Sequence, residues 1–99
     1  MLNIQKTLEN GSAVFALQGR LDTVSAPALE QALKDALPEL RELTLDLSAL
    51  DYISSAGLRV LLSAQKQIQR QGTMKLTGVN EAVREIFDVT GFSEILTIV

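Results

Sequence analysis

The sequence predicts one α/β domain, with a mixed sheet of four strands, or five if residues 95–99 add one, and helices packed on one face. Two periodicities lead to this prediction. Segments in which apolar and polar residues alternate, as in strands with one face open to water, are interleaved with segments whose apolar residues recur at helical spacing. No repeat or linker interrupts the 99 residues, so we expect residues 1–99 to form a single domain.

A β-hairpin is predicted at the N-terminus. Residues 2–8 alternate in polarity, and an apolar run follows Asn10 and Gly11, a pair that favours a tight turn with positive φ. We therefore expect the second strand at 12–18 and a loop over 19–23.

A helix and a third strand are predicted next. Apolar residues between 29 and 37 recur at helical spacing, and Thr23 or Ser25 is a candidate N-cap. Pro38 ends this helix because a proline disfavours helical geometry in the residue before it. Alternation over 43–47 then predicts the strand.

The second half of the chain has the same alternation of helix and strand. The apolar residues of 58–68 share one helical stripe, and Gly72 is predicted to end that helix as a left-handed C-cap. Alternation over 74–78 predicts a fourth strand, and Asn80 and Gly91 are predicted to cap the two ends of a short third helix.

The composition excludes several kinds of chemistry. The chain has no cysteine and no histidine, which excludes disulfides, thiol nucleophiles, zinc sites built from thiolate and imidazole, and mechanisms that need an imidazole base. The net charge of −3, dispersed basic residues and few aromatic residues give no pattern for binding nucleic acid. We expect no metal and no cofactor.

The remaining polar residues give no enzyme motif. Asp22, Asp46 and Asp51 fall in predicted loops or on the polar side of a strand, where solvated carboxylates are ordinary. The first strand is not followed by the acidic pair of a phosphate-accepting receiver domain, and no P-loop is present, so we expect no enzymatic activity. The start of the chain lacks the pattern of an export signal, and no segment approaches the about 18 apolar residues of a membrane span. We expect a cytoplasmic protein.

Residues 46–58 run from the predicted end of a strand directly into a helix N-terminus, where α/β sheets commonly place their sites. Unpaired backbone N–H groups and the helix dipole favour an anion there, and the hydroxyl of Ser54 or Ser55 could hold a phosphate. The ordinary interpretation is that such a serine is only an N-cap, worth about 1 kcal/mol. The residues alone leave both interpretations open.

Four short motifs lie in order along nearly the whole chain. They are Gly19-Arg20-Leu21-Asp22, Leu45-Asp46-Leu47-Ser48, Tyr52-Ile53-Ser54-Ser55-Ala56-Gly57-Leu58 and Phe87-Asp88-Val89-Thr90-Gly91-Phe92. In their order and spacing these motifs resemble the STAS domain of bacterial anti-sigma factor antagonists. A set of four motifs in register is far more specific than any one of them.

The resemblance implies a partner-switching protein, and we take a monomer as the default state of the free protein. Such an antagonist binds an anti-sigma factor that is also a serine kinase, which frees a sigma factor. The kinase phosphorylates a serine at the start of the second helix, and a PP2C-type phosphatase removes the phosphate. The implied phosphoacceptor is Ser55, and Arg59 lies one turn later, where it could pair with the phosphate. The implied partner-binding residues are Asp22, Thr23, Ser54, Ala56, Gly57, Leu58 and Arg59.

Three features in and beside the motif separate this chain from the pattern common in the family. Ser54 stands where many members have aspartate, Ala56 stands where a second serine is frequent, and Arg59 stands where glycine is frequent. An alternative function keeps the fold and drops the switch: STAS domains also serve as unphosphorylated scaffolds, for example as a small subunit of a lipid-transport ATPase complex. A weak nucleotide hydrolase is a third alternative.

Overall fold

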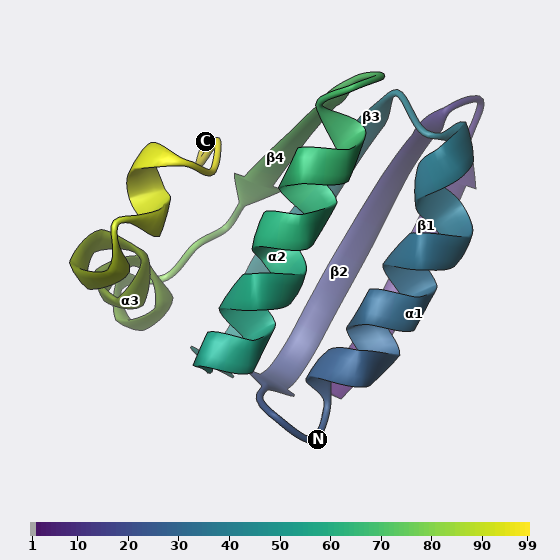
Figure 1. Ribbon diagram of the computed structural model, residues 1–99. Coiled ribbons are helices and arrows are strands. Elements are labelled where there is room, and N and C mark those ends of the chain that lie inside the picture. The colour runs from purple at the N-terminus through teal and green to yellow at the C-terminus, as the bar shows by residue number, and fades with distance from the viewer. Residues whose placement is uncertain (1) are drawn as a thin grey trace.

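The computed structural model describes residues 2–99 as one layer of strands covered by helices (Figure 1). The elements in chain order are β1 (Leu2–Glu9), β2 (Ser12–Leu21), α1 (Ala26–Ala36), the 3-10 turn η1 (Leu37–Glu39), β3 (Glu42–Ile53), α2 (Ser55–Ile68), β4 (Thr73–Thr77), α3 (Glu81–Thr90) and the 3-10 turn η2 (Phe92–Glu94).

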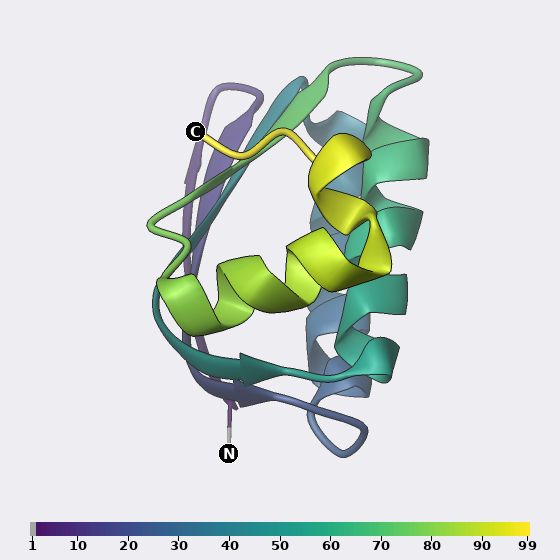
Figure 2. The same ribbon diagram turned by 90° about the vertical axis from the view of Figure 1, so that its left-hand side faces the viewer.

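The sheet is mixed, with the strand order β1-β2-β3-β4. β1 is antiparallel to β2, and the pairs β2–β3 and β3–β4 are parallel. Asn10 and Gly11 form the predicted turn of the hairpin, with φ values of 39° and 86°. Figures 1 and 2 show α1 and α2 on one face of the sheet and α3 beside the β4 edge, with no helix of residues 2–99 on the other face. This confirms the predicted mixed sheet with helices on one side.

The core lies between the sheet and the two long helices. Phe15, Leu45 and Leu76 are paired in register across β2, β3 and β4, and all three are fully buried. Leu29 of α1 and Leu61 of α2 are fully buried in the same core. No polar or charged residue is buried among residues 2–99. The alternation that predicted the strands therefore also predicted the buried face.

β2 and β3 are longer than predicted. Arg20 and Leu21 pair with Tyr52 and Ile53, so β2 continues to residue 21 and the predicted loop over 19–23 is reduced to its last two residues. Two register shifts between the strands precede this pairing. Each strand is extended because it pairs in parallel with the other, which is distant in the sequence, and local periodicity does not reveal such a pairing.

The predicted ends of α2 and of the chain need correction. Gly72 does not have a positive φ, so the predicted left-handed C-cap is wrong. A β-carbon at Gly72 would overlap the backbone of Arg41, whose carbonyl accepts the N–H of Thr73, so a glycine is needed here for close backbone approach. Residues 95–99 form no strand, and their contact with β4 is a single parallel bridge between Leu76 and Ile98.

The third helix is as predicted at both ends. The side chain of Asn80 accepts the N–H of Val83 at 2.9 Å, and Gly91 follows α3 with a φ of 80°. The amide nitrogen of Asn80 also donates to the carbonyl of Leu50 at 2.7 Å. One side chain therefore caps α3 and ties it to β3.

Candidate functional site

α2 begins where β3 ends, and Ser54 makes this junction. Its backbone is extended, and its Oγ accepts the N–H of Gly57 at 3.4 Å, so Ser54 is the N-cap of α2. The N–H of Ser54 donates to the carbonyl of Leu21 at 2.8 Å, which joins the start of α2 to the end of β2. The hydroxyl of Ser54 thus has a structural partner, and its residue is only partly exposed.

Ser55 is the first residue of α2 and has a different environment. Its side chain is exposed, and its hydroxyl makes no hydrogen bond within the part of the chain that the structure describes. The unpaired N–H groups and the positive end of the helix dipole lie at this position. The serine pair therefore consists of one cap, Ser54, and one free hydroxyl, Ser55, so the N-cap interpretation is confirmed for Ser54 and does not apply to Ser55.

Gly57 allows α2 to sit directly on the ends of β2 and β3. A β-carbon at this buried position would lie 2.7 Å from Cγ of Leu21 and 2.9 Å from Cγ1 of Ile53. Leu58 is also buried, with 5% of its surface exposed. Gly57 and Leu58, predicted to bind a partner, therefore have no accessible side chain and instead hold Ser55 and Ala56 in place.

The loop between β2 and α1 is fixed by Asp22 and Ser25. Oδ1 of Asp22 accepts the N–H groups of Val24 and Ser25, each at 3.1 Å. The hydrogen bond from the Ser25 backbone is the main reason that the pKa of Asp22 is lowered. Oγ of Ser25 accepts the N–H of Asp22 at 2.9 Å and donates to the carbonyl of Arg20 at 2.8 Å. Ser25 thus occupies the N-cap position of α1, but its side chain bonds to the loop and not to the helix.

Arg20 and Tyr52 extend this arrangement onto the neighbouring strand and were missed by the sequence analysis. The guanidinium carbon of Arg20 lies 4.4 Å from the centre of the Tyr52 ring, and Nε of Arg20 lies 3.8 Å from Oδ2 of Asp22. The two residues are 32 positions apart and meet only because they pair in register across β2 and β3. Both residues lie in the motifs that the sequence analysis identified, but the motifs do not indicate that the two side chains are in contact.

A shallow groove of about 220 Å³ lies between the first turns of α1 and α2. One wall contains Thr23, Ala26, Pro27 and Glu30, and the other contains Ala56, Arg59 and Val60. The structure thus brings three of the predicted partner-binding residues, Thr23, Ala56 and Arg59, to one place beside Ser55. We call this the switch groove.

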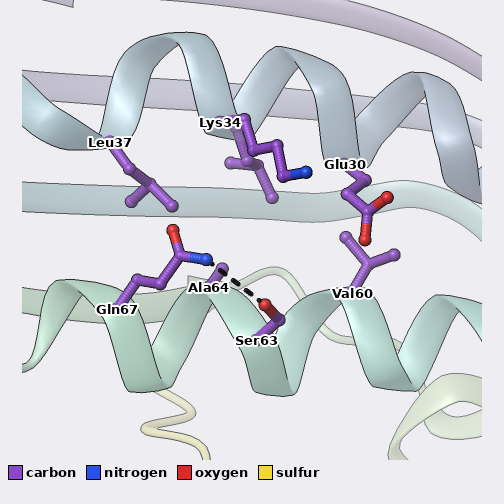
Figure 3. Close-up of a pocket in the computed structure, with 8 residues that line it drawn as sticks. Glu30, Lys34, Leu37, Val60, Ser63, Ala64 and Gln67 are labelled. Carbon is purple, nitrogen blue, oxygen red and sulfur yellow. Dashed lines mark hydrogen bonds between the residues drawn. The ribbon is translucent and has the colours of Figure 1, made fainter.

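Further along the same two helices, the seam between them is filled by side chains (Figure 3). Its free space is about 10 Å³, and along its α2 side Nε2 of Gln67 donates to Oγ of Ser63 at 3.5 Å. A space of this size is at the lower limit for one water molecule. The switch groove, and not the seam, is therefore accessible to another molecule.

The other predicted acidic residues do not converge on a site. Oδ1 of Asp46 accepts the N–H of Ser48 at 3.0 Å, which lowers the pKa of Asp46, and Asp51 is exposed on β3. Residues 2–99 contain no group of three or more acidic side chains that could hold a metal ion. In the same residues no helix is long and apolar enough to cross a membrane.

Comparison with known proteins gives a consistent result. The family model described as the STAS domain matches residues 3–99. The chain is 40% identical over 91 residues to BtrV of Bordetella bronchiseptica, covering 90% of this chain and 78% of BtrV. It is 31% identical over 98 residues to a Bacillus subtilis protein named anti-sigma-B factor antagonist, covering 98% and 90% of the two chains.

The structural comparison agrees with the sequence comparison. The crystal structure of an anti-sigma factor antagonist from Mycobacterium paratuberculosis superposes with a TM-score of 0.90 at 25% identity, covering 99% of this chain and 85% of that one. The fold is thus that of a known family, and this chain belongs to the STAS domain family, together with proteins named as anti-sigma factor antagonists.

Proposed function

We propose that this protein is an anti-sigma factor antagonist whose binding to an anti-sigma factor is switched off by phosphorylation of Ser55. The observation that carries the proposal is the free, exposed hydroxyl of Ser55 at the first position of α2, next to the switch groove. Relatives named as antagonists of anti-sigma factors support the same partner class for this chain.

The proposed chemistry belongs to the partners. The anti-sigma factor, acting as a serine kinase, transfers the γ-phosphoryl group of ATP to Oγ of Ser55. A bond forms between Oγ and phosphorus, the bond to the β-phosphate oxygen breaks, ADP leaves, and the hydroxyl proton passes to a base of the kinase. A PP2C-type phosphatase reverses the state with water, which releases inorganic phosphate. This chain supplies one positioned hydroxyl and is itself no enzyme.

The physical basis of the switch is the cost of burying the phosphate. Phosphorylation adds about −1.5 to −2 charges at pH 7. In the free protein, water and the first N–H groups of α2 stabilise the phosphate at Ser55. In a complex the same dianion would have to leave water inside the interface, which is costly unless it is paired there. The free state therefore tolerates the phosphate, and the complex does not.

The predicted contact residues keep separate functions in this proposal. Asp22 holds the loop through its bonds to backbone N–H groups, while Thr23, Ala56 and Arg59 offer accessible surface to the partner. Ser54 caps the helix that presents Ser55. The protein is proposed to be monomeric when free and to work in the cytoplasm, because bacterial sigma factors act there on RNA polymerase.

The serine pair also bears on the scaffold alternative. An unphosphorylated scaffold needs both serines only as structural groups, and Ser54 alone provides the cap. The hydroxyl of Ser55 has no structural partner within residues 2–99, so the scaffold alternative leaves it without an explanation.

A phosphorylation map tests the proposal. The partner is captured from the source organism on the immobilised chain, purified, and incubated with the chain and ATP, and phosphate is located by mass spectrometry. We expect modification of Ser55, loss of modification in Ser55→Ala, and retention in Ser54→Ala. A captured kinase that leaves Ser55 unmodified would refute the switch, and Ser55→Asp that binds the partner as tightly as the unmodified chain would refute its mechanism. We expect Ser55→Asp to bind at least tenfold more weakly, about 1.4 kcal/mol.

A further inference from the structure

Arg59 is an exposed cation on α2 that lines the switch groove. The ion pairs within residues 2–99 are Arg20 with Asp22 and Arg84 with Asp88, so the guanidinium of Arg59 has no carboxylate partner there. An arginine side chain stays charged at any pH at which proteins fold, and its planar fork matches a phosphate. A free guanidinium of this kind is available for an anion.

The spacing on α2 places Arg59 beside Ser55. The two residues are four positions apart on one helix, which puts them on the same face with about 6 Å between β-carbons. Side chains in a helix point toward the N-terminus of that helix, so the side chain of Arg59 extends toward the turn that contains Ser55. An anion that precedes a cation by four residues is also the more favourable of the two orders.

The neighbouring carboxylates of Asp22 and Glu30 do not pair with Arg59. Oδ1 of Asp22 accepts two backbone N–H groups of its own loop, and Oδ2 lies near Arg20. Glu30, on the opposite wall of the switch groove, lies one turn before Lys34 of α1, and Figure 3 shows both side chains over the seam between the helices. Neither carboxylate lies within 4.0 Å of the Arg59 guanidinium.

We propose that Arg59 is the receptor of the phosphate on Ser55, and that this pairing draws away from the switch groove the one positive side chain that lines it within residues 2–99. This inference rests on the proposed function, because it concerns the phosphorylated state of Ser55. Glu30 then remains as the charged residue of the groove lining. Phosphorylation therefore changes the surface offered to the partner at two points. One is the hydroxyl of Ser55, and the other is the part of the switch groove that Arg59 lines.

The experiment installs the phosphate without any kinase. Phosphoserine is incorporated at position 55 by genetic encoding, and the second pKa of the phosphate is measured by 31P NMR in the parent chain and in Arg59→Gln. Pairing with a guanidinium stabilises the dianion and lowers its pKa. We expect the phosphate pKa to rise by about 0.3 unit in Arg59→Gln, or about a twofold change in proton affinity, as for an exposed helical ion pair. Arg59→Lys should give an intermediate value, because a lysine keeps the charge without the fork.

Arg70→Gln is the matched control. Arg70 is exposed and lies beyond the end of α2, roughly 20 Å along the helix axis from Ser55, so its loss removes the same charge without the proximity. We expect Arg70→Gln to leave the phosphate pKa unchanged. In the parent chain the Nε resonance of Arg59 should move with the titration of the phosphate, which a merely structural arginine would not do.

The outcomes separate this inference from the proposed function. Equal phosphate pKa values in Arg59→Gln and Arg70→Gln, with an Nε resonance of Arg59 that ignores the titration, would overturn the pairing. A kinase that modifies a residue other than Ser55 would refute the proposed switch, but it would not alter the result of this measurement, because the phosphoserine is incorporated during translation and not by the kinase.

Discussion

Replacement of Gly57 by alanine tests how closely α2 must approach the sheet to present Ser55. The added β-carbon would meet Cγ of Leu21 at 2.7 Å and Cγ1 of Ile53 at 2.9 Å. Both neighbours are buried core residues at the ends of β2 and β3. Since both side chains are buried and these distances are below normal carbon–carbon contact, we expect the first turn of α2 to move away from the sheet.

The magnitude follows from two opposing effects. Overpacking in a well-packed core costs about 1–3 kcal/mol. Alanine gains up to about 1 kcal/mol over glycine in a helix, although less in the first turn than in the interior. We therefore expect Gly57→Ala to lower the free energy of unfolding by about 1–2 kcal/mol, or to lower Tm by about 4–8 °C per kcal/mol in a domain of this size.

Urea unfolding followed by circular dichroism measures this change. Ser63→Ala, at an exposed position of the same helix, is the control for helix propensity and should be neutral or slightly stabilising. In a background that carries Leu21→Ala, the cost of Gly57→Ala should fall, because the nearest atoms have been removed. If Gly57→Ala stabilises the chain like Ser63→Ala, the close approach of α2 to the sheet is refuted.

Three further predictions concern single side chains. Asn80→Ala should cost about 1–2 kcal/mol in urea unfolding, because it removes the cap of α3 and leaves the carbonyl of Leu50 without its donor; a loss below about 0.5 kcal/mol would contradict this. Ser54→Ala should lower the free energy of unfolding by about 0.5–1 kcal/mol, since its capping bond is long at 3.4 Å, and Ser55→Ala should stay within about 0.5 kcal/mol of the parent. A larger loss in Ser55→Ala than in Ser54→Ala would show that Ser55 is the cap and Ser54 the free serine. The folded pKa of Asp22 is lowered, so its contribution to stability is present above the unfolded value near 3.8 and is lost as pH falls through the folded pKa. Asp22→Asn should therefore lose less stability than the parent between pH 5 and pH 3, and equal losses would refute the contribution.

Most of the fold was predictable because its signals are local. The helical stripe that contains Leu61, the alternation around Leu45, and the caps at Asn80 and Gly91 each depend on residues within one or two turns of each other. These signals gave the element order and the covered face. They gave the ends of elements less well where the partner is distant in sequence, as in the pairing of β2 with the end of β3.

For the candidate site, the sequence predicted member residues but not their contacts. The motifs identified Asp22 and Ser55, but the contact between Arg20 and Tyr52 needs the register of two parallel strands. Burial of Leu58 likewise depends on how the first turn of α2 packs on the sheet. Sequence therefore proposed the residues of the candidate site, while tertiary packing decided which of them another molecule can reach.

The division of the serine pair follows from the position at which α2 begins. Ser54 has extended backbone and turns its Oγ inward to the N–H of Gly57, whereas Ser55 is already helical and exposes its hydroxyl. A start one residue later would make Ser55 the cap and would give its hydroxyl a structural partner. The hydrogen bond from Ser54 to the carbonyl of Leu21, and the close packing of Gly57, fix the start where it is. The buried contacts beneath the helix thus determine that Ser55, and not Ser54, is the serine whose hydroxyl another molecule can reach.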